Sequence, residues 1–252
     1  MIHFVGAGCG AADLITMRGA ELLKKADAII YAGSLVSPAL LDYAKPSCKI
    51  FNSAKMTLDE VIAVMERMEG DGKMTVRLHT GDPSIYGAIR EQMDRLDALH
   101  IPHEVCPGVS SFCGAAAALR AEYTLPGVSQ SVIITRMAGR TPVPEREAIR
   151  SLAAHQTTMV IFLSAGLTED LQAELLAGGY GAQTPAAIVY KASWPEEKIV
   201  HCTVGTLHQA AIESAIKNHA LIAVGGFLGD DYELSKLYDP AFTTAFRQGT
   251  ER

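Results

Sequence analysis

The chain has 252 residues, of which 48% are hydrophobic and 20% charged, and its formal net charge is −6. These proportions are typical of a globular protein with an ample core, built as one large domain or two ordinary ones. The acidic balance argues against nucleic acid as the main partner, but a small polyanionic substrate needs only a local cluster of Arg and Lys. No apolar run reaches the roughly 18 residues of a membrane span, and the strand-like start resembles no signal peptide, so we expect a cytoplasmic protein.

The cysteines and histidines show no metal-binding pattern. The five cysteines are an odd number at scattered positions without a C-x-x-C pair, and the eight histidines have no spacing that pairs with them. Clustered ligands are what a zinc site requires. We therefore expect reduced thiols and no metal site.

The first half of the chain alternates apolar strands with amphipathic helices. Strands are expected at Ile2–Val5, Ala28–Tyr31, Met74–Leu78 and His103–Cys106. Helices are indicated by the stripe Gly19, Leu22, Leu23, Ala26, by the capping box of Thr57 and Glu60, by Ile85, Ile89 and Leu96, and by the small residues from Cys113 to Leu119. This alternation predicts a mostly parallel sheet with helices on both faces.

The pattern lapses between Glu122 and Val128, where Pro126-Gly127 breaks it. Beyond it, strands are expected at Val132–Ile134, Met159–Leu163, Ala186–Val189, Ile199–Val204 and Leu221–Val224, with helices that include Leu167, Leu171 and Leu175 or open with a capping box from Thr206 to Gln209. We predict two α/β domains of similar size, residues 1–124 and 125–252, with a ligand cleft between them.

The first strand runs directly into a glycine loop. Gly6, Gly8 and Ala11 fit the G-x-G-x-x-G/A pattern of dinucleotide-binding proteins. In those proteins the helix starts at once, whereas here residues 11–16 intervene, and no acidic residue ends the second strand at residues 31–34. These departures leave a nicotinamide-dependent oxidoreductase as a remote alternative.

Two further corners follow later strands. One is Gly81-Asp82-Pro83 and the other runs from Pro107 to Ser111. Each alone is an ordinary strand–turn–helix corner with a capping residue. Because the carboxyl ends of parallel strands share one edge of a sheet, we expect the three loops to converge there and form a ligand site.

Together these residues resemble the tetrapyrrole (precorrin) methyltransferases. The family's opening pattern, G-x-G-x-G followed by D-L-(L/I)-T-x-(R/K)-G, is matched by Gly6 to Gly10, Asp13 to Thr16, Arg18 and Gly19, and both later corners match as well. The resemblance covers nearly the whole chain. It implies the two-domain tetrapyrrole methylase fold, S-adenosylmethionine as the cofactor and a homodimer.

Within the family, three segments resemble the branch that methylates C-11 of precorrin-4, with the cobalt-containing substrate as the better match. They are Asn52–Met56, Thr135–Glu145 and Tyr232–Tyr238. Their cations Lys55, Arg136 and Arg140 could meet the acetate and propionate groups of a tetrapyrrole, or could be solvated surface residues.

The resemblance also implies a set of cofactor contacts and leaves the catalytic base open. The implied contacts are Cys9, Thr80, Gly81, Asp82, Ile85, Ser110, Ser111, Leu163 and Ala192. The uroporphyrinogen branch carries an Asp where this chain has Ala32, so no base is inherited. Asp82 is expected to shape the methionine end of the cofactor pocket.

Three other functions remain open from the sequence. The methyl acceptor could be another precorrin carbon or uroporphyrinogen III. The chain could be the nicotinamide-dependent oxidoreductase considered above, or a binding module without catalysis. Only the methyltransferase interpretation explains all three corners together.

Overall fold

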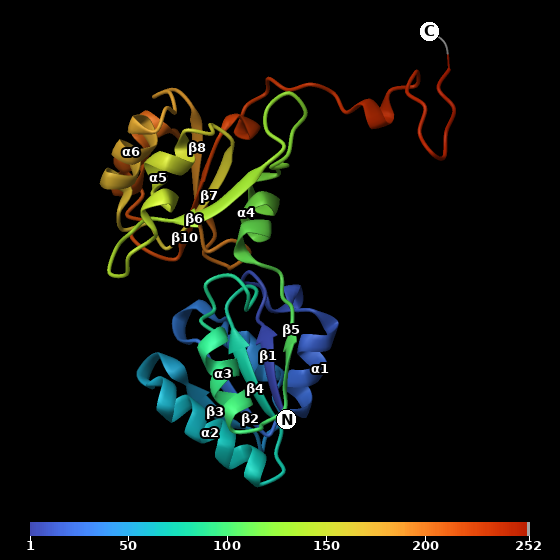
Figure 1. Ribbon diagram of the computed structural model, residues 1–252, viewed down its shortest axis with the longest axis vertical. Helices are drawn as coiled ribbons and strands as arrows, with labels where there is room; N and C mark the ends of the chain where they lie inside the picture. The colour runs from blue at the N-terminus through green and yellow to red at the C-terminus, as the bar shows by residue number, and fades with distance from the viewer. Residues whose placement is uncertain (251–252) are drawn as a thin grey trace. The chain divides into compact units, whose positions relative to one another are not determined.

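The computed structural model describes residues 1–250 and contains two compact α/β units, each built on a five-stranded sheet (Figure 1). Contacts within the chain group residues 1–118 with residues 191–198 as the first unit, and residues 119–190 with those after 198 as the second. The predicted two-domain α/β class is confirmed. The division by contacts does not test the predicted domain limits, 1–124 and 125–252, which stay a prediction.

The sheet of the first unit is wholly parallel, with the order β3-β2-β4-β1-β5. Its strands are β1 (Ile2–Gly6), β2 (Ala28–Tyr31), β3 (Lys49–Asn52), β4 (Thr75–His79) and β5 (His103–Cys106). The four predicted strands are present. β3 is not predicted from the sequence, because the mostly exposed, partly polar residues of this edge strand give no buried alternation.

Helices cover both faces of this sheet because its strands alternate between two apolar clusters. They are α1 (Met17–Lys25), α2 (Leu58–Gly70) and α3 (Arg90–Ala98), whereas α4 (Ser111–Leu119), which follows β5, contributes no described residue to either cluster. Val5 and Leu78 pack with Leu23 of α1 on one face. Phe4 and Met65 belong to the cluster on the other face, under α2 and α3. The central strands are therefore buried on both sides, as parallel sheets require.

The start of α2 confirms a predicted capping box, whereas the start of α3 differs from the prediction. Thr57 Oγ1 accepts a hydrogen bond from the Glu60 N–H at 3.3 Å, and Glu60 Oε2 accepts one from the Thr57 N–H at 2.7 Å. The helix expected to include Ile85 begins only at Arg90. Tyr86 and Ala88 have positive φ angles of 56° and 49°, which no right-handed helix contains.

The sheet of the second unit is mixed, with the order β6-β7-β10-β8-β9. Its strands are β6 (Val132–Arg136), β7 (Thr158–Phe162), β8 (Pro185–Tyr190), β9 (Lys198–Thr203) and β10 (Ala220–Val224), and its helices are α5 (Ile149–Ala153), α6 (Thr168–Ala177) and α7 (Leu207–Glu213). β6 and β7 are parallel, and β10 runs antiparallel to β7 and β8. All five predicted strands are present.

One apolar cluster fills the second unit and includes Leu171 and Leu175 of α6. The capping box predicted from Thr206 to Gln209 is wrong. Thr206 Oγ1 instead accepts a hydrogen bond from the Thr203 N–H at 3.0 Å, because a short 3₁₀ turn precedes α7. Within residues 1–250 no helix is both long and apolar enough to cross a membrane.

The capping box of α2 gives a stability prediction. Thr57→Ala removes the hydroxyl that accepts from the Glu60 N–H, and we expect the free energy of unfolding to fall by about 1 kcal/mol. Thr57→Ser keeps the hydroxyl and is the matched control. Urea unfolding followed by circular dichroism measures both, and equal midpoints for the two variants would contradict the capping role.

Candidate functional site

Two of the predicted corners are joined by their backbones at the carboxyl edge of the first sheet. The Gly8 N–H donates to Gly81 O at 3.2 Å, and the Gly81 N–H donates to Gly8 O at 3.0 Å. The pair forms an isolated antiparallel bridge beyond the ends of β1 and β4. The Ala7 N–H also donates to His79 O at 2.7 Å. The glycine loop and the Gly-Asp-Pro corner therefore form one surface.

The third corner touches both of the others, which only glycine allows. A Cβ atom built on Gly6 would lie 2.5 Å from Gly108 Cα, and one built on Gly108 would lie 2.3 Å from Gly81 O. These neighbours are backbone atoms, which no rotamer change can move aside. The predicted convergence of the three corners is confirmed.

Asp82 connects the second corner to the third through its carboxylate. Oδ2 accepts a hydrogen bond from the Gly108 N–H at 2.8 Å, and Oδ1 accepts from the Ser84 N–H at 2.9 Å and from the Ser84 hydroxyl. Partial burial by itself raises the pKa of the Asp82 carboxyl, but these hydrogen bonds outweigh it and hold the pKa below its ordinary value. Asp82 thus braces the site by holding two loops together.

The chain leaves the glycine loop without starting a helix. A 3₁₀ turn at Ala12–Leu14 follows, and α1 begins at Met17 after Thr16, whose Oγ1 accepts from the Gly19 N–H at 3.1 Å. The delay expected from the sequence is confirmed. No helix N-terminus directly follows this loop, so the geometry that binds a dinucleotide pyrophosphate is missing there.

Residues 191–198, which follow β8, pack on the glycine loop within the first unit. Ser193 Oγ accepts a hydrogen bond from the Ala11 N–H at 3.0 Å and lies 3.5 Å from Cys9 Sγ. A Cβ atom on Gly10 would lie 2.3 Å from the Trp194 side chain and 2.5 Å from Ala192 O. Ser193 and Trp194 are not predicted from the sequence, because nothing in their local pattern signals a contact across some 180 residues of chain.

Cys9 and Ala192 both lie against α4. A Cβ atom on Gly114 would lie 2.7 Å from Cys9 Cβ and 3.6 Å from Ala192 Cβ. One on Gly81 would lie 3.3 Å from Ser111 N and 3.4 Å from Ser110 Cα. The structure thus brings together the implied cofactor residues of the first unit, which are Cys9, Thr80, Gly81, Asp82, Ile85, Ser110, Ser111 and Ala192.

The remaining implied cofactor residue, Leu163, lies in the second unit directly after β7. Its side chain is 64% exposed, and its φ angle is +53°. An exposed leucine in the left-handed region is uncommon and marks a locally constrained turn.

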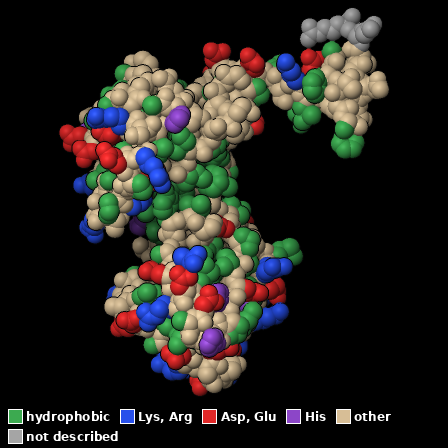
Figure 2. Space-filling model, viewed as in Figure 1, with side chains coloured by type: hydrophobic (Ala, Val, Ile, Leu, Met, Phe, Trp, Pro, Cys, Tyr) green, Lys and Arg blue, Asp and Glu red, His purple; other side chains and the backbone are tan. Residues whose placement is uncertain are grey.

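The three cations proposed for the substrate have different surroundings. Arg136 donates to the carbonyls of Met137, Thr141 and Pro142 at 3.1, 3.2 and 2.8 Å, and so orders the loop that follows β6. Arg140 is exposed in that loop, and Lys55 is exposed at the end of a 3₁₀ turn before α2. On the face drawn in Figure 2, acidic and basic side chains intermingle instead of forming one basic surface.

The described residues contain no group of three or more His, Cys, Asp or Glu side chains placed to hold a metal ion. The three joined corners consist mainly of backbone groups, small side chains and the braced carboxylate of Asp82.

Residues 1–208 match the family model for Tetrapyrrole (Corrin/Porphyrin) Methylases. The chain belongs to this family. The resemblance deduced from the glycine loop and the two later corners is confirmed, since the matched residues include all three.

Named relatives and solved structures agree with this assignment. A cobalt-precorrin-4 C(11)-methyltransferase of Methanocaldococcus jannaschii is 51% identical over the whole of this chain and 97% of its own length. The solved structure of a cobalt precorrin-4 methyltransferase superposes with a TM-score of 0.89 at 45% identity, over 91% of this chain and 96% of that one. A uroporphyrin-III C-methyltransferase of Thermus thermophilus, complexed with S-adenosyl homocysteine, gives 0.77 at 26% identity, over 90% and 98%.

The close backbone packing of the corners gives a second prediction. Gly6→Ala places a methyl group against the backbone of Gly108 and Gly81, and we expect the free energy of unfolding to fall by about 1–3 kcal/mol. Gly70→Ala is the matched control, since a Cβ there meets nothing within 4 Å. Urea unfolding compares the two, and a neutral Gly6→Ala would contradict the contact.

The lowered pKa of Asp82 gives a pH-dependent prediction. Its stabilising contribution is complete above the pKa of the unfolded state and is lost as the pH falls through the lower folded pKa. Asp82→Asn lacks this contribution. We therefore expect the stability gap between wild type and Asp82→Asn to be constant near neutral pH and to narrow between about pH 5 and pH 2. Urea unfolding at several pH values measures it, and a gap that widens in acid would be the contrary result.

Proposed function

We propose that this protein transfers a methyl group from S-adenosylmethionine to C-11 of precorrin-4, in its cobalt-containing form, during cobalamin biosynthesis. The observation that carries the proposal is the 51% identity, over the whole chain, to a relative of that name. The three joined corners and the solved cobalt precorrin-4 methyltransferase structure at a TM-score of 0.89 support it.

The residues of the first unit fit the proposed cofactor. The site presents only backbone atoms at Gly6, Gly10 and Gly108, and we call this surface the floor of the site. A Cβ on any of these residues would collide with neighbouring atoms. Beside this floor lies the backbone of Ser110 and Ser111, two residues with hydroxyl groups. We propose that these groups, with Cys9, Thr80, Ile85 and Ala192, hold the cofactor, and that Asp82 shapes the site by fixing the corners. Leu163 remains a predicted contact from the second unit.

Bound S-adenosylmethionine would supply a methyl group already activated by its sulfonium charge. An enamine-like C-11 would supply the electron pair of the new carbon–carbon bond, the sulfur would keep the electrons of the broken bond, and the macrocycle would then lose a proton. Since charge is dispersed in this step, the protein contributes mainly by holding the reacting atoms about 3–3.5 Å apart and in line. Ala32 offers no side chain that could act as a base, and we assign none.

We propose that the exposed cations Lys55 and Arg140 meet carboxylates of the tetrapyrrole. For Arg136, predicted as a third substrate cation, we propose that it orders the loop that carries Arg140, because its guanidinium donates to three carbonyls of that loop. We also propose that the protein is cytoplasmic and acts as a homodimer. Size-exclusion chromatography with light scattering tests the homodimer directly.

A different methyl acceptor is the second candidate. The Thermus thermophilus relative at 26% identity is named for uroporphyrin III, and its fold gives a TM-score of 0.77. The alanine at position 32 disfavours this substrate, since that branch of the family carries an aspartate there.

Methyl transfer to a set of tetrapyrroles tests the proposal. The purified protein is incubated with S-adenosylmethionine carrying a ¹³C-methyl group and with cobalt-precorrin-4, metal-free precorrin-4 or uroporphyrinogen III. We expect one new ¹³C-methyl signal, on C-11, and faster turnover of the cobalt form. A methyl on another carbon, or turnover of uroporphyrinogen III alone, would overturn the assignment.

A further inference from the structure

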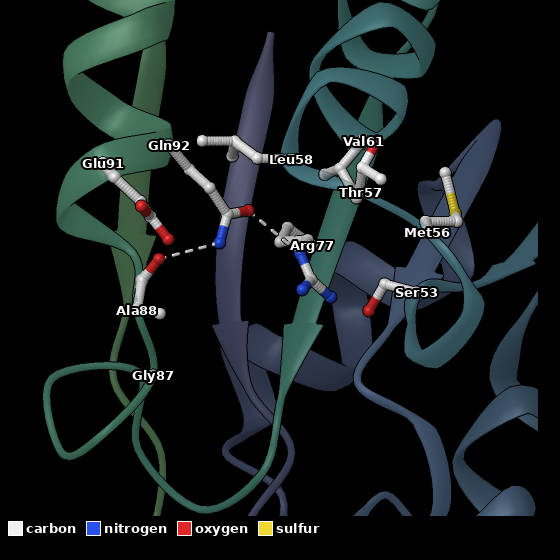
Figure 3. Close-up of a pocket in the computed structure, with 10 residues that line it drawn as sticks. All are labelled: Ser53, Met56, Thr57, Leu58, Val61, Arg77, Gly87, Ala88, Glu91 and Gln92. Atoms are coloured by element: carbon white, nitrogen blue, oxygen red, sulfur yellow. Dashed lines mark hydrogen bonds between the residues drawn. The ribbon is translucent and has the colours of Figure 1, made fainter. Parts of the chain in front are cut away.

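A pocket of about 190 Å³ lies in the first unit between the N-terminal ends of α2 and α3 (Figure 3). This volume far exceeds the ~10–15 Å³ that admits a single water molecule. The lining residues used below are Ser53, Thr57, Arg77, Ala88, Glu91 and Gln92. None of them is among the implied cofactor contacts, and none is one of the three cations predicted for the substrate.

Arg77 of β4 carries a buried positive charge that no carboxylate within residues 1–250 neutralises. Its side chain is only 7% exposed. Nε donates to Gln92 Oε1 at 3.1 Å and Nη1 donates to Ile30 O at 3.1 Å, and residues 1–250 contain no ion pair to it. Burial lowers the pKa of Arg77 to about 10. Buried charges are normally paired, because desolvation of a lone charge is costly.

The unused part of the guanidinium faces the pocket. The two hydrogen bonds occupy Nε and Nη1, and across residues 1–250 no protein group bonds to Nη2. Figure 3 shows the tip of Arg77 directed into the space between Gln92 and Ser53. If Arg77 only connected β2 to α3, the two hydrogen bonds already made would be enough. Its guanidinium has five N–H donors, so most of them would then have no use.

The loop before α3 holds this arrangement in place. Gln92 Nε2 donates to Ala88 O at 2.9 Å, which aims Gln92 Oε1 at Arg77. Ala88 itself has a φ angle of +49°, and Tyr86 two residues earlier has +56°. Such left-handed non-glycine residues cost energy and cluster at binding sites.

The pocket's electrostatics favour an anion. The N-termini of α2 and α3 both border it, and helix N-termini carry a partial positive charge. At the start of α3, Ile89 provides no side-chain cap. Glu91 on the rim opposes an anion, but it is exposed to solvent, which screens it, whereas Arg77 is buried.

We infer that Arg77 forms a subsite for one carboxylate arm of the tetrapyrrole, held at Nη2 at the base of this pocket. The inference rests on the proposed function, since it takes the tetrapyrrole as the source of the carboxylate. A guanidinium in a partly dehydrated pocket suits a carboxylate because its planar N–H groups match the two oxygens. Arg77 would then select which side chain of the macrocycle enters, and so fix which ring carbon reaches the methyl group.

Binding of succinate tests the subsite without the tetrapyrrole. At constant ionic strength, calorimetry measures succinate affinity for wild type, Arg77→Gln and Arg90→Gln. Arg90→Gln is the matched control, because it removes one positive charge from the exposed start of α3. We expect Arg77→Gln to weaken succinate binding about 10- to 100-fold, as for loss of a charge-assisted hydrogen bond, and the control to leave it unchanged.

Two outcomes of this assay would overturn the subsite: no saturable succinate binding to wild type, or equal binding to Arg77→Gln. Unchanged affinity for S-adenosylhomocysteine and an unchanged circular dichroism spectrum establish that Arg77→Gln is folded. Arg77→Lys, which keeps the charge but loses the planar fork, is expected to bind succinate with intermediate affinity.

A second assay tests which arm is bound. Cobalt-precorrin-4 is converted to a mixture of monoamides, each with one carboxylate neutralised, and the unreacted isomers are identified after partial turnover. Wild type should leave one isomer behind, with kcat/KM reduced about 10- to 100-fold. Arg77→Gln should no longer discriminate against it, and equal discrimination by both proteins would refute the subsite. If wild type methylates neither the isomers nor cobalt-precorrin-4 itself, the proposed function fails, while the succinate assay still tests the subsite.

Discussion

Direct contact between the backbones of three loops is the constraint on which the rest of the structure depends. Gly6, Gly81 and Gly108 meet at separations that leave no room for a Cβ on Gly6 or Gly108. The parallel sheet brings these loops to one edge, but it does not by itself press them together. The carboxylate of Asp82 does so, by accepting from the Gly108 N–H. A floor of bare backbone follows, on which a flat or extended ligand can lie.

The absence of side chains on the glycines of the loop also explains why residues distant in sequence pack against this loop. Gly10 leaves space that Trp194 and Ala192 O fill, and Ser193 takes up the Ala11 N–H. The segment 191–198 thereby groups with the first unit although its neighbours in the chain belong to the second. Glycine at the loop thus sets both what a ligand can approach and which part of the chain covers the loop.

The positive charges of Arg136 and Arg77 are placed by a different rule from the backbone packing that shapes the loops. Arg136 donates to carbonyls of its own loop, whereas Arg77, on a central strand, has one nitrogen beside a pocket that no group of the described chain contacts by a hydrogen bond. Arg136 is half-buried, and both of its Nη atoms already donate to carbonyls. A buried guanidinium gains more from an arriving anion. A binding role is therefore better supported for Arg77, which the motifs did not single out, than for Arg136, which they did.

The sequence by itself determined the parallel first sheet, nine of the ten strands, the delayed helix after the glycine loop and the family, because apolar periodicity and loop motifs are local. It missed the edge strand β3 and placed a helix through Tyr86 and Ala88, since backbone conformation there depends on the surrounding packing. Only the tertiary structure decided that Asp82 braces two loops, that Trp194 packs on Gly10, and that Arg77 is buried without a counter-ion among residues 1–250. Those facts are contacts between distant segments, and local sequence patterns do not encode the distances between them.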